Sequence, residues 1–408
     1  MRVTLNVKHI LFTVLAALLA LGAVELGLRL LYVAVSDEPG IPDAKLGARP
    51  NPGFPGHDRQ GFRNPEVPAR AEVVALGDSQ TYGVNVADDE PWPRLVASLT
   101  RKNVYNMAYG GYGPVHSLLL WDTAMALRPG VVIEAFYAGN DLYDSYAIVY
   151  NRGQLPELRS GDAATRERIR RAEAAETLEA IVARGYYLGA PPASSAAPPP
   201  EESAGEFLAR HSMIFSVLAT AKHDAQRRMA SPQTNREADW RAARAFAAAR
   251  PAFCELFDDG LRRTVLTSEY RLTALNLADP RIEEGLHIAL RAILEMRERA
   301  AARKVRFIVL LIPTKETVFG SRPFQGRPAF RALLENEAQL WARMKAFLGR
   351  AGIETLDALP ALRARLDAGA QPYGVSHDGH PNAEGHRAIA GIVAAALACP
   401  QSGANCDR

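Results

Sequence analysis

Two short stretches of the sequence carry residue types that nucleophilic catalysis requires. Ser79 follows an apolar run, residues 73–76, in the stretch VVALGDSQTYGVN. Near the other end of the chain, the stretch VSHDGHPNAEGH places Asp378 two residues before His380. A serine hydroxyl becomes an effective nucleophile when a base removes its proton and a further group orients that base. Ser79 and His380 are therefore the predicted nucleophile and base, with Asp378 close to the base.

Each of these residues could also have a purely structural role. Asp78 or Ser79 can simply cap a helix, which is a common role for both residue types. His377 and His386 compete with His380 for the role of base, although His386 falls inside a predicted helix, where a packing or surface role is expected. A phosphate-binding loop is the other functional reading of GDSQTYG, but the stretch lacks the Gly-Lys-Ser/Thr ending.

The loops after two further apolar runs offer hydrogen-bond donors for an oxyanion. Gly111 lies in NMAYGGYGP, where its backbone N–H can face an incoming oxygen with no side chain in the way. Asn140 lies in YAGNDLYD, and its side-chain amide is a neutral donor. Gly-Gly and Gly-Asn pairs are also ordinary turn formers. Together with the loops of Ser79 and His380, these make four loops that each follow a predicted strand and carry a residue type that the chemistry needs. This combination predicts oxyanion donors at Gly111 and Asn140.

These residues need a scaffold that brings them to one edge, and the hydrophobic patterning predicts one. Apolar runs alternate with helical patterns, first over VVALG, NVYNMA and GVVIEAFYAG, and later over RFIVLLIP and IETLDAL. This alternation predicts a parallel sheet of about five strands with crossover helices. The carboxyl ends of the strands in such a sheet line the ligand crevice. Ser79 follows the first strand, and Asn382 is expected to cap the helix after the last one.

The rest of the chain divides by composition. Residues 37–70 are rich in proline and glycine and are predicted to form a linker arm, and the sheet domain is assigned to residues 71–144 and 263–398. Between its halves, residues 145–262 are rich in Ala, Arg and Glu, which predicts a helical insertion after the third strand. The insertion contains APPASSAAPPPEESAG, which is expected to be a disordered Pro/Ala/Ser-rich loop.

The N-terminal segment, residues 1–36, has the charge pattern of a membrane anchor. Arg2 and Lys8 lie before or at the start of a long apolar run, and Asp37 and Glu38 follow it. Positive charge before the span and acid after it predict a cytoplasmic N-terminus and a periplasmic sheet domain. We expect an uncleaved signal-anchor helix in place of a removed signal peptide, because the small-residue cleavage sites are poor. A buried core helix at the start of a soluble domain is the remaining alternative.

The composition excludes some classes of function. The 408 residues include 48 basic and 45 acidic ones with no dominant basic tract, so no nucleic-acid partner is predicted. Cys254, Cys399 and Cys406 do not have metal-ligand spacing, and HDGH lacks a third ligand nearby, so no metal or cofactor is predicted. Cys399 and Cys406 either form a disulfide or remain thiols in a loose C-terminal tail.

Taken together, the motifs resemble those of the SGNH (GDSL-like) hydrolase family. The blocks GDSQTYG, NMAYGGYG, GND and DGHPN occur in that family's order, and the resemblance covers residues 72–144 and about 305–395. It implies a flavodoxin-like three-layer α/β/α domain that cleaves esters through an acyl-serine. Carried over by position, Ser79 is the nucleophile, His380 the base and Asp378 the residue that orients it. The Ser79 N–H, the Gly111 N–H and the Asn140 amide form the oxyanion hole.

Two positions depart from the family's pattern. Many members place the aspartate three residues before the histidine, where this chain has His377, and Asp378 is at a spacing of two. The leucine that commonly follows the serine is Gln80 here, which we expect to affect the pocket wall and not the chemistry.

Two other functions remain compatible with the same residues. A membrane-tethered domain of this type also suits O-acyl transfer on cell-surface polysaccharide, with a sugar hydroxyl as acceptor in place of water, so an acylated glycan is a possible partner as well as a simple ester. The third hypothesis is an inactive, anchored glycan-binding or assembly protein. Lys315, after the fourth predicted strand, has two readings: a contact for an anionic substrate, or a solvated Lys–Glu pair with Glu316.

Overall fold

The computed structural model describes most of the chain, in two compact units. The described residues are 7–34, 38–189, 208, 212–229, 231–320 and 327–398. The N-terminal unit comprises Met1–Pro39, Gly53–Pro55 and Pro191–Ala238, and the sheet unit comprises Gly40–Pro52, Gly56–Ala190 and Asp239–Arg408. The predicted Pro/Ala/Ser-rich loop, and Cys399 and Cys406, lie outside the described residues.

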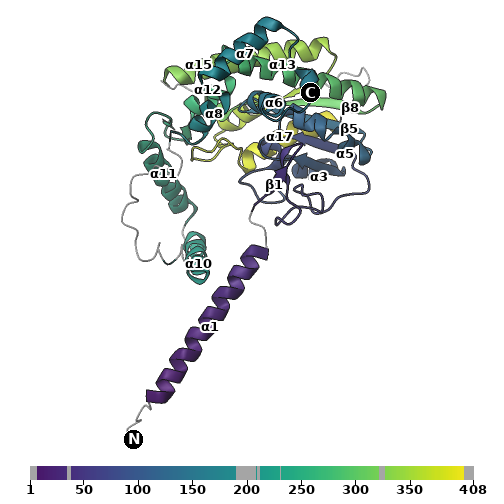
Figure 1. The fold of residues 1–408 in the computed structure, drawn as a ribbon. Helices are drawn as coiled ribbons and strands as arrows, with labels where there is room; N and C mark the ends of the chain where they lie inside the picture. Colours follow the sequence, from purple (N-terminus) through teal and green to yellow (C-terminus); the bar gives the residue numbers. More distant parts are fainter. Residues whose placement is uncertain are drawn as a thin grey trace. The chain divides into compact units, whose positions relative to one another are not determined.

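A five-stranded parallel sheet forms the centre of the sheet unit (Figure 1). Its strands lie in the order β4-β3-β5-β8-β9. Its strands are β3 (Val73–Gly77), β4 (Val104–Ala108), β5 (Val131–Tyr137), β8 (Arg306–Ile312) and β9 (Glu354–Asp357). In chain order within the sheet this is 2-1-3-4-5, the flavodoxin-like arrangement, which places a ligand crevice between the first and third strands. The predicted fold class is therefore confirmed.

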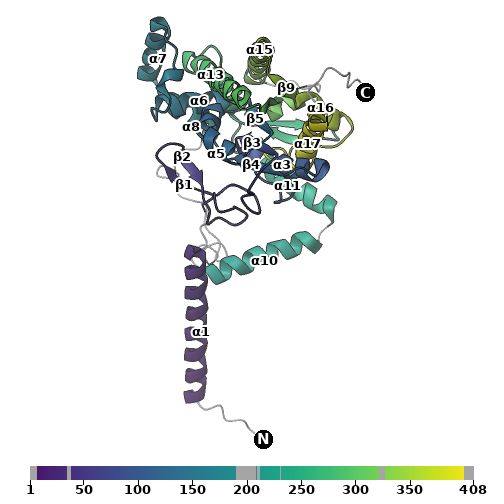
Figure 2. The ribbon, with the colours of Figure 1, turned by 90° about the vertical axis from the view of Figure 1, so that its right-hand side faces the viewer.

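Both faces of the sheet are covered, because successive residues of each strand point to opposite sides. On β5, Val132 and Phe136 enter one core, while Ile133, Ala135 and Tyr137 enter the other. The first core packs under α4 (Pro114–Leu119), α5 (Trp121–Ala126), α6 (Asp141–Tyr150), α13 (Pro280–Ala302) and α15 (Pro328–Arg350). The second packs under α3 (Trp92–Thr100), α14 (Lys315–Phe319), α16 (Leu359–Asp367) and α17 (Ala383–Ala398), and Figure 2 shows the two helical layers.

The segment before β3 is packed onto the sheet unit, although its composition predicts a linker arm. It forms an antiparallel hairpin of β1 (Gly40–Asp43) and β2 (Gly47–Pro50). Further along, the Tyr105 hydroxyl donates to Asp58 at 2.8 Å, and the Asn64 amide donates to the Asn106 carbonyl at 2.9 Å. These bonds fix the segment beside β4, the edge strand of the sheet.

The region between β5 and β8 is mainly helical, as expected, but it ends in a short antiparallel hairpin. The hairpin joins β6 (Glu255–Asp258) to β7 (Arg263–Leu266). The helical elements that the structure describes here besides α6 and α13 are η1 (Pro156–Leu158), α7 (Ala163–Ala175), α8 (Leu178–Tyr186), α10 (Met213–Met229), α11 (Pro232–Ala248) and α12 (Ser268–Leu275).

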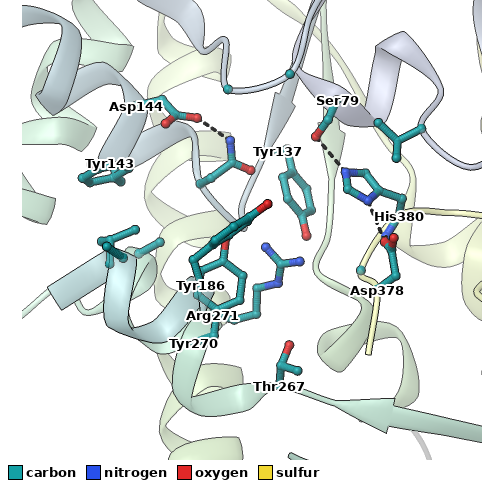
Figure 3. Close-up of a pocket in the computed structure, with 18 of the residues that line it drawn as sticks. Ser79, Tyr137, Tyr143, Asp144, Tyr186, Thr267, Tyr270, Arg271, Asp378 and His380 are labelled. Carbon is teal, nitrogen blue, oxygen red and sulfur yellow. Dashed lines mark hydrogen bonds and ion pairs between the residues drawn. The ribbon is translucent and has the colours of Figure 1, made fainter. Parts of the chain in front are cut away.

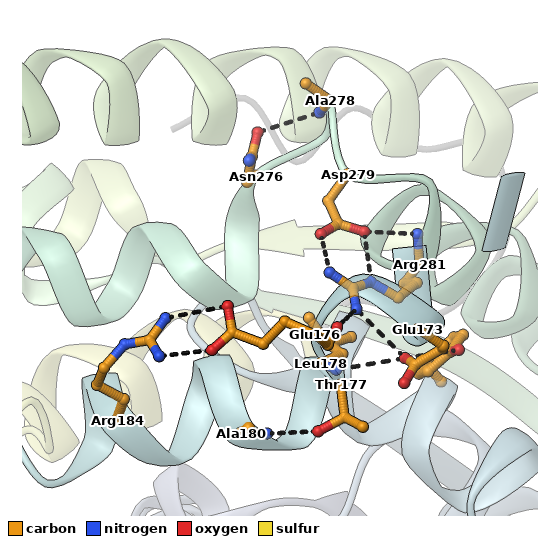
Figure 4. A network of polar contacts seen from close by, with 11 residues as sticks. Glu173, Glu176, Thr177, Leu178, Ala180, Arg184, Asn276, Ala278, Asp279 and Arg281 are labelled. Atoms are coloured by element: carbon orange, nitrogen blue, oxygen red, sulfur yellow. Dashed lines mark hydrogen bonds and ion pairs between the residues drawn. The ribbon is translucent and has the colours of Figure 1, made fainter. Parts of the chain in front are cut away.

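A buried arginine fixes the corner between α7 and α8 (Figure 4). Arg281, at the start of α13, is only 4% exposed, and its guanidinium donates to the Asp279 carboxylate at 2.7 and 2.9 Å. The same guanidinium donates to the Glu176 carbonyl at 2.6 Å and lies 3.5 Å from the Glu173 carboxylate. Since a buried cation is costly unless it is fully paired, this network holds α8 firmly against the body of the unit.

In the N-terminal unit, α1 (Val7–Ala34) contains a window, Leu11–Arg29, that is long and apolar enough to cross a membrane. The Arg29 Nε donates to the Glu25 carboxylate at 2.8 Å. Glu25 also accepts the backbone N–H groups of Met213 and Ile214, at 2.9 and 3.1 Å, and so caps the start of α10. An apolar helix is thus present where the sequence predicts one.

Candidate active site

Ser79 lies in a sharp turn between β3 and the short helix α2 (Ser79–Tyr82). Gly77 has a φ of +146°, and a Cβ there would lie 2.7 Å from the Thr81 Oγ1 and 3.0 Å from the Ala135 carbonyl oxygen, so only glycine fits. Asp78 caps α2 by accepting the Gln80 N–H at 2.9 Å. The capping interpretation of this stretch is therefore correct for Asp78, whose Oδ2 also lies 3.3 Å from the Ser79 Oγ, and the Ser79 side chain lines the crevice.

Ser79, His380 and Asp378 are brought together as one hydrogen-bonded chain (Figure 3). The His380 Nε2 lies 2.9 Å from the Ser79 Oγ, and the His380 Nδ1 lies 2.6 Å from the Asp378 Oδ1. Burial alone would raise the pKa of Asp378, but the hydrogen bonds from His380 outweigh it and hold that pKa well below its usual range. An ionised carboxylate only accepts, so the Nδ1 carries a proton and the Nε2 is free to accept one from Ser79.

The carboxylate of Asp378 is itself held in place. Its Oδ1 also accepts the His380 backbone N–H at 2.7 Å, and its Oδ2 accepts the side-chain amide of Asn85. Asn85 has a φ of +63°, a left-handed conformation that asparagine tolerates better than most residues. No local sequence pattern marks Asn85, because this contact joins residues 293 positions apart.

Lys315 supports the loop that carries Asp378. It is therefore neither the substrate contact nor the solvated partner of Glu316 that the sequence suggested. Its side chain is fully buried, and its ammonium donates to the carbonyl oxygens of Val265, Ser376 and Asp378 at 2.6, 3.0 and 2.9 Å. Burial lowers the pKa of Lys315 to about 8. Glu316 is also fully buried and accepts the Thr267 N–H, so the two side chains do not form a solvated pair.

The predicted oxyanion donors lie around the same cavity. Gly111 has a φ of +74°, and a Cβ built on the preceding Gly110 would lie 3.9 Å from the Ser79 Cβ, so this loop passes close to the serine. Asn140 follows β5 and donates its side-chain N–H to the Asp144 carboxylate. This bond uses one amide hydrogen and leaves the second hydrogen available to an oxyanion.

Several carboxyl groups are buried around and behind this site. Burial raises the pKa of Asp78 to about 6 and the pKa values of Glu134 and Asp144 to about 8, the last two helped by the negative charge of Asp78. Burial and the same charge raise the pKa of Asp141 as well. Glu134 and Asp144 therefore tend to hold protons near neutral pH, whereas Asp78 and Asp378 are mainly ionised there.

The two competing histidines have other positions. The ring of His377 stacks on Phe246, with 4.0 Å between ring centroids, and burial lowers its pKa. His386 is fully buried in α17, accepts the Trp92 backbone N–H at 3.2 Å, and burial lowers its pKa to about 3. His386 therefore has the packing role expected of it.

A cavity of about 750 Å³ opens in front of Ser79, and the insertion forms one of its walls. Tyr187, just after α8, lines the cavity. Tyr143, Tyr186 and Tyr270 line it as well (Figure 3). Arg271 of α12 also lines it, although no sequence motif marked this residue. Among the described residues, no group of three or more His, Cys, Asp or Glu side chains is arranged to hold a metal ion.

Comparisons with known proteins give structural likenesses only. No family model matches the chain, and no curated protein matches it. Among solved structures, a GDSL-like lipase from Bacteroides thetaiotaomicron is 11% identical with a TM-score of 0.34, and the match covers 80% of this chain and 87% of that one. Phospholipase A1 from Streptomyces albidoflavus is 12% identical with a TM-score of 0.37, over 81% and 100% of the two chains.

An alpha/beta hydrolase from the metagenome of Lake Arreo, Spain, is also 12% identical, with a TM-score of 0.35 over 82% of this chain and 99% of that one. All three solved structures are described as lipases or other hydrolases. Because each TM-score is below 0.5, these likenesses add no weight to the roles of individual residues, which rest on the distances given above.

Proposed function

We propose that this protein is a serine ester hydrolase with Ser79 as nucleophile, His380 as base and Asp378 as the residue that orients the base. The observation that carries the proposal is a continuous chain of hydrogen bonds: 2.9 Å from the Ser79 Oγ to the His380 Nε2, and 2.6 Å from the His380 Nδ1 to the Asp378 Oδ1. This chain lies on the wall of a cavity large enough for a small ester.

The mechanism follows from the positions of these atoms. His380 takes the Ser79 proton as the Oγ attacks the ester carbonyl, and the Ser79 N–H, the Gly111 N–H and the Asn140 amide receive the developing oxyanion. The protonated His380 then gives its proton to the departing alcohol, which leaves an acyl-serine. Water, deprotonated by His380, cleaves the acyl-serine and restores the free hydroxyl.

The decisive experiment compares Ser79→Ala with the unaltered full-length protein on p-nitrophenyl butanoate. We expect loss of nearly all turnover, and loss of labelling by a fluorophosphonate probe, with the thermal unfolding midpoint unchanged. Ser98→Ala, at an exposed position of α3, is the matched control and retains both properties. Turnover by Ser79→Ala at the parental rate would refute the assignment, and absence of probe labelling in the parent would favour an inactive binding protein.

Acyl transfer to a glycan is a second candidate, favoured by the surroundings of the cavity. A smaller hollow of about 250 Å³ meets the main cavity at Gly110, Gly111, Tyr143 and Asp144, so a second molecule has room beside an acyl-serine. Exposed tyrosine rings offer faces on which a sugar can stack. Incubation with an acyl donor and an oligosaccharide, followed by mass spectrometry, separates the cases: acylated sugar indicates transfer, and free acid alone indicates hydrolysis.

We further propose that α1 is an uncleaved anchor that holds the sheet unit on the periplasmic side. The apolar window Leu11–Arg29 and the flanking charges, basic before and acidic after, support this orientation. A membrane-impermeant thiol reagent tests it in intact spheroplasts, applied to a cysteine introduced at the exposed Ser98. Labelling before lysis is expected, and labelling only after lysis would contradict the proposed side.

A further inference from the structure

The cavity contains a buried cation that no carboxylate of the described residues pairs with directly. Arg271 is 7% exposed, yet among the described residues its guanidinium has no hydrogen-bond acceptor and no ion-pair partner. The Nε is buried without any partner. Other buried arginines of the unit differ: Arg281 and Arg262, 4% and 6% exposed, both donate to carboxylates. Arg271 is therefore an exception within its own protein.

The guanidinium of Arg271 lies next to the proposed triad. Its Cζ is 5.7 Å from the centre of the Tyr137 ring and 4.6 Å from that of Tyr270. A Cβ built on Gly379, the residue between Asp378 and His380, would lie 3.2 Å from the Arg271 Cζ. Figure 3 shows the side chain reaching from α12 toward Tyr137 and the loop that carries Asp378.

Nearby polar groups leave a place for an anion. The Tyr137 hydroxyl is buried, and no group in the described part of the chain hydrogen-bonds to it. Of the neighbouring carboxylates, Asp378 is engaged by His380 and Asn85, while Glu316 accepts the Thr267 N–H through its Oε1 and does not hydrogen-bond to Arg271 through its buried, unpartnered Oε2. The other carboxylate of the cavity that Figure 3 labels, Asp144, lies on the side of Tyr143, away from Arg271. A buried guanidinium without acceptors is unfavourable, and binding of a carboxylate or phosphate group would remove that cost.

On this basis we propose that Arg271, assisted by the Tyr137 hydroxyl, binds an anionic carboxylate or phosphate group on the non-reacting part of the ester substrate. The inference rests on the proposed ester hydrolysis and names the class of ester: one that carries a negative charge near the scissile bond. A planar guanidinium can give two parallel hydrogen bonds to such a group, which fixes the ester carbonyl relative to Ser79.

The test uses pairs of esters that differ only in charge. Mono-p-nitrophenyl succinate, glutarate and adipate are compared with the neutral butanoate, pentanoate and hexanoate, and a phosphonate-bearing acyl ester forms the phosphate arm. Para-acetoxybenzoate against para-tolyl acetate places the charge on the alcohol side. The full-length protein should have a higher kcat/KM for the charged ester than for the neutral ester in at least one pair. The pair with the largest ratio identifies the kind of anion and whether the acyl side or the alcohol side of the ester carries it.

Variants at Arg271 then decide whether this residue gives the preference. In Arg271→Gln the ratio of kcat/KM for charged over neutral ester should fall by about 10- to 100-fold, the usual worth of a charge-assisted hydrogen bond, and Arg271→Lys should retain part of it. Arg299→Gln removes the same charge from an exposed position of α13 and should leave the ratio unchanged. If both esters lose activity equally in Arg271→Gln, the residue only supports the loop at Gly379 and the proposal is wrong.

A binding measurement separates this proposal from the hydrolase assignment. Calorimetry on the Ser79→Ala variant measures binding of an uncleavable amide: the monomethyl amide of adipic acid, or the corresponding phosphonate amide if the phosphonate ester was preferred. We expect the amide to bind to Ser79→Ala and not to the double variant Ser79→Ala/Arg271→Gln. Equal binding with and without Arg271 overturns the anion site. Absence of any ester cleavage by the parent, together with Arg271-dependent binding, would instead refute the proposed chemistry and leave the anion site standing.

Discussion

The His380 Nε2 lies 2.9 Å from the Ser79 Oγ, although the two residues are 301 positions apart in the chain. Neither residue is held by its own loop alone. Ser79 is fixed by the turn at the end of β3, and the loop before His380 is tied to β7 through the Val265 N–H and the Val375 carbonyl at 3.1 Å. The contact therefore depends on the whole sheet unit, and the following predictions test its parts.

Asp378→Asn should lower kcat by about 10³- to 10⁴-fold with a small change in KM, because an amide can offer its N–H to His380 and stabilise the wrong tautomer. Steady-state kinetics on p-nitrophenyl butanoate measures this. Asp367→Asn, beyond the triad at the end of α16, serves as the control. Retention of more than about a tenth of kcat would show that Asp378 is not the orienting acid.

Asn85 should act as a positioning residue for Asp378. Asn85→Gly keeps the left-handed backbone but removes the amide that donates to the Asp378 Oδ2. We expect kcat to fall by about 3- to 10-fold, less than the full worth of a hydrogen bond to a charged group, because the contact is exposed and acts only through the position of Asp378. Asn85→Asp places a like charge beside Asp378 and should lower activity further while raising the pKa of Asp378. Equal activity of Asn85→Gly and the parent would contradict the role.

Asn140→Ala should lower kcat by about 10²- to 10³-fold, the effect of losing one oxyanion donor. Asp144→Ala leaves the amide in place but removes the carboxylate that fixes it, so a smaller loss, about tenfold, is expected. The double variant should then be no worse than Asn140→Ala, because Asp144 acts only through Asn140. Additive losses in the double variant would indicate that Asp144 contacts the substrate itself.

Lys315→Met should loosen the loop that carries Asp378. The substitution leaves three carbonyl oxygens without their donor and should lower the free energy of unfolding by about 3 kcal/mol or more, with a fall in kcat as well. Lys345→Met removes an exposed lysine paired with Asp357 and is the matched control. Denaturant titration in detergent gives the stability, and a loss no larger than that of the control would refute the structural role.

His386 should make the protein less stable in acid. The pKa of this histidine is about 3 in the folded protein, against about 6.5 in an unfolded chain. Between these values the unfolded chain binds more protons, so the free energy of unfolding falls as the pH drops, by at most about 1.4 kcal/mol per pH unit for one such group. His116, whose pKa burial also lowers to about 3, contributes in the same direction.

His386→Asn keeps an acceptor for the Trp92 N–H but no longer titrates, so its unfolding free energy should depend less steeply on pH between 6.5 and 3. Denaturant titrations at several pH values measure the slope. His287→Asn, at an exposed position of α13, should keep the parental slope. An unchanged slope in His386→Asn would mean that another group causes the acid sensitivity.

The sequence by itself determined which chemistry is available and in what kind of sheet. Short apolar runs of strand length, alternating with amphipathic helices, predicted the parallel strands, because each run needs burial on both faces. Residue type and position after these runs marked Ser79, Gly111, Asn140 and His380. Local capping was also predictable: Asn382 accepts the N–H groups of Glu384 and Gly385 at 3.0 and 3.2 Å.

Only the tertiary structure decided which of these residues meet and what environment surrounds them. Asn85, Arg271 and Lys315 carry no local signal, because their roles come from contacts with segments 50 to 293 positions away or from burial against them. The sequence read Lys315 as exposed, whereas packing of α14 under the loop of Asp378 buries it completely. Charge and burial depend on all the elements that pack together, which a local pattern does not contain.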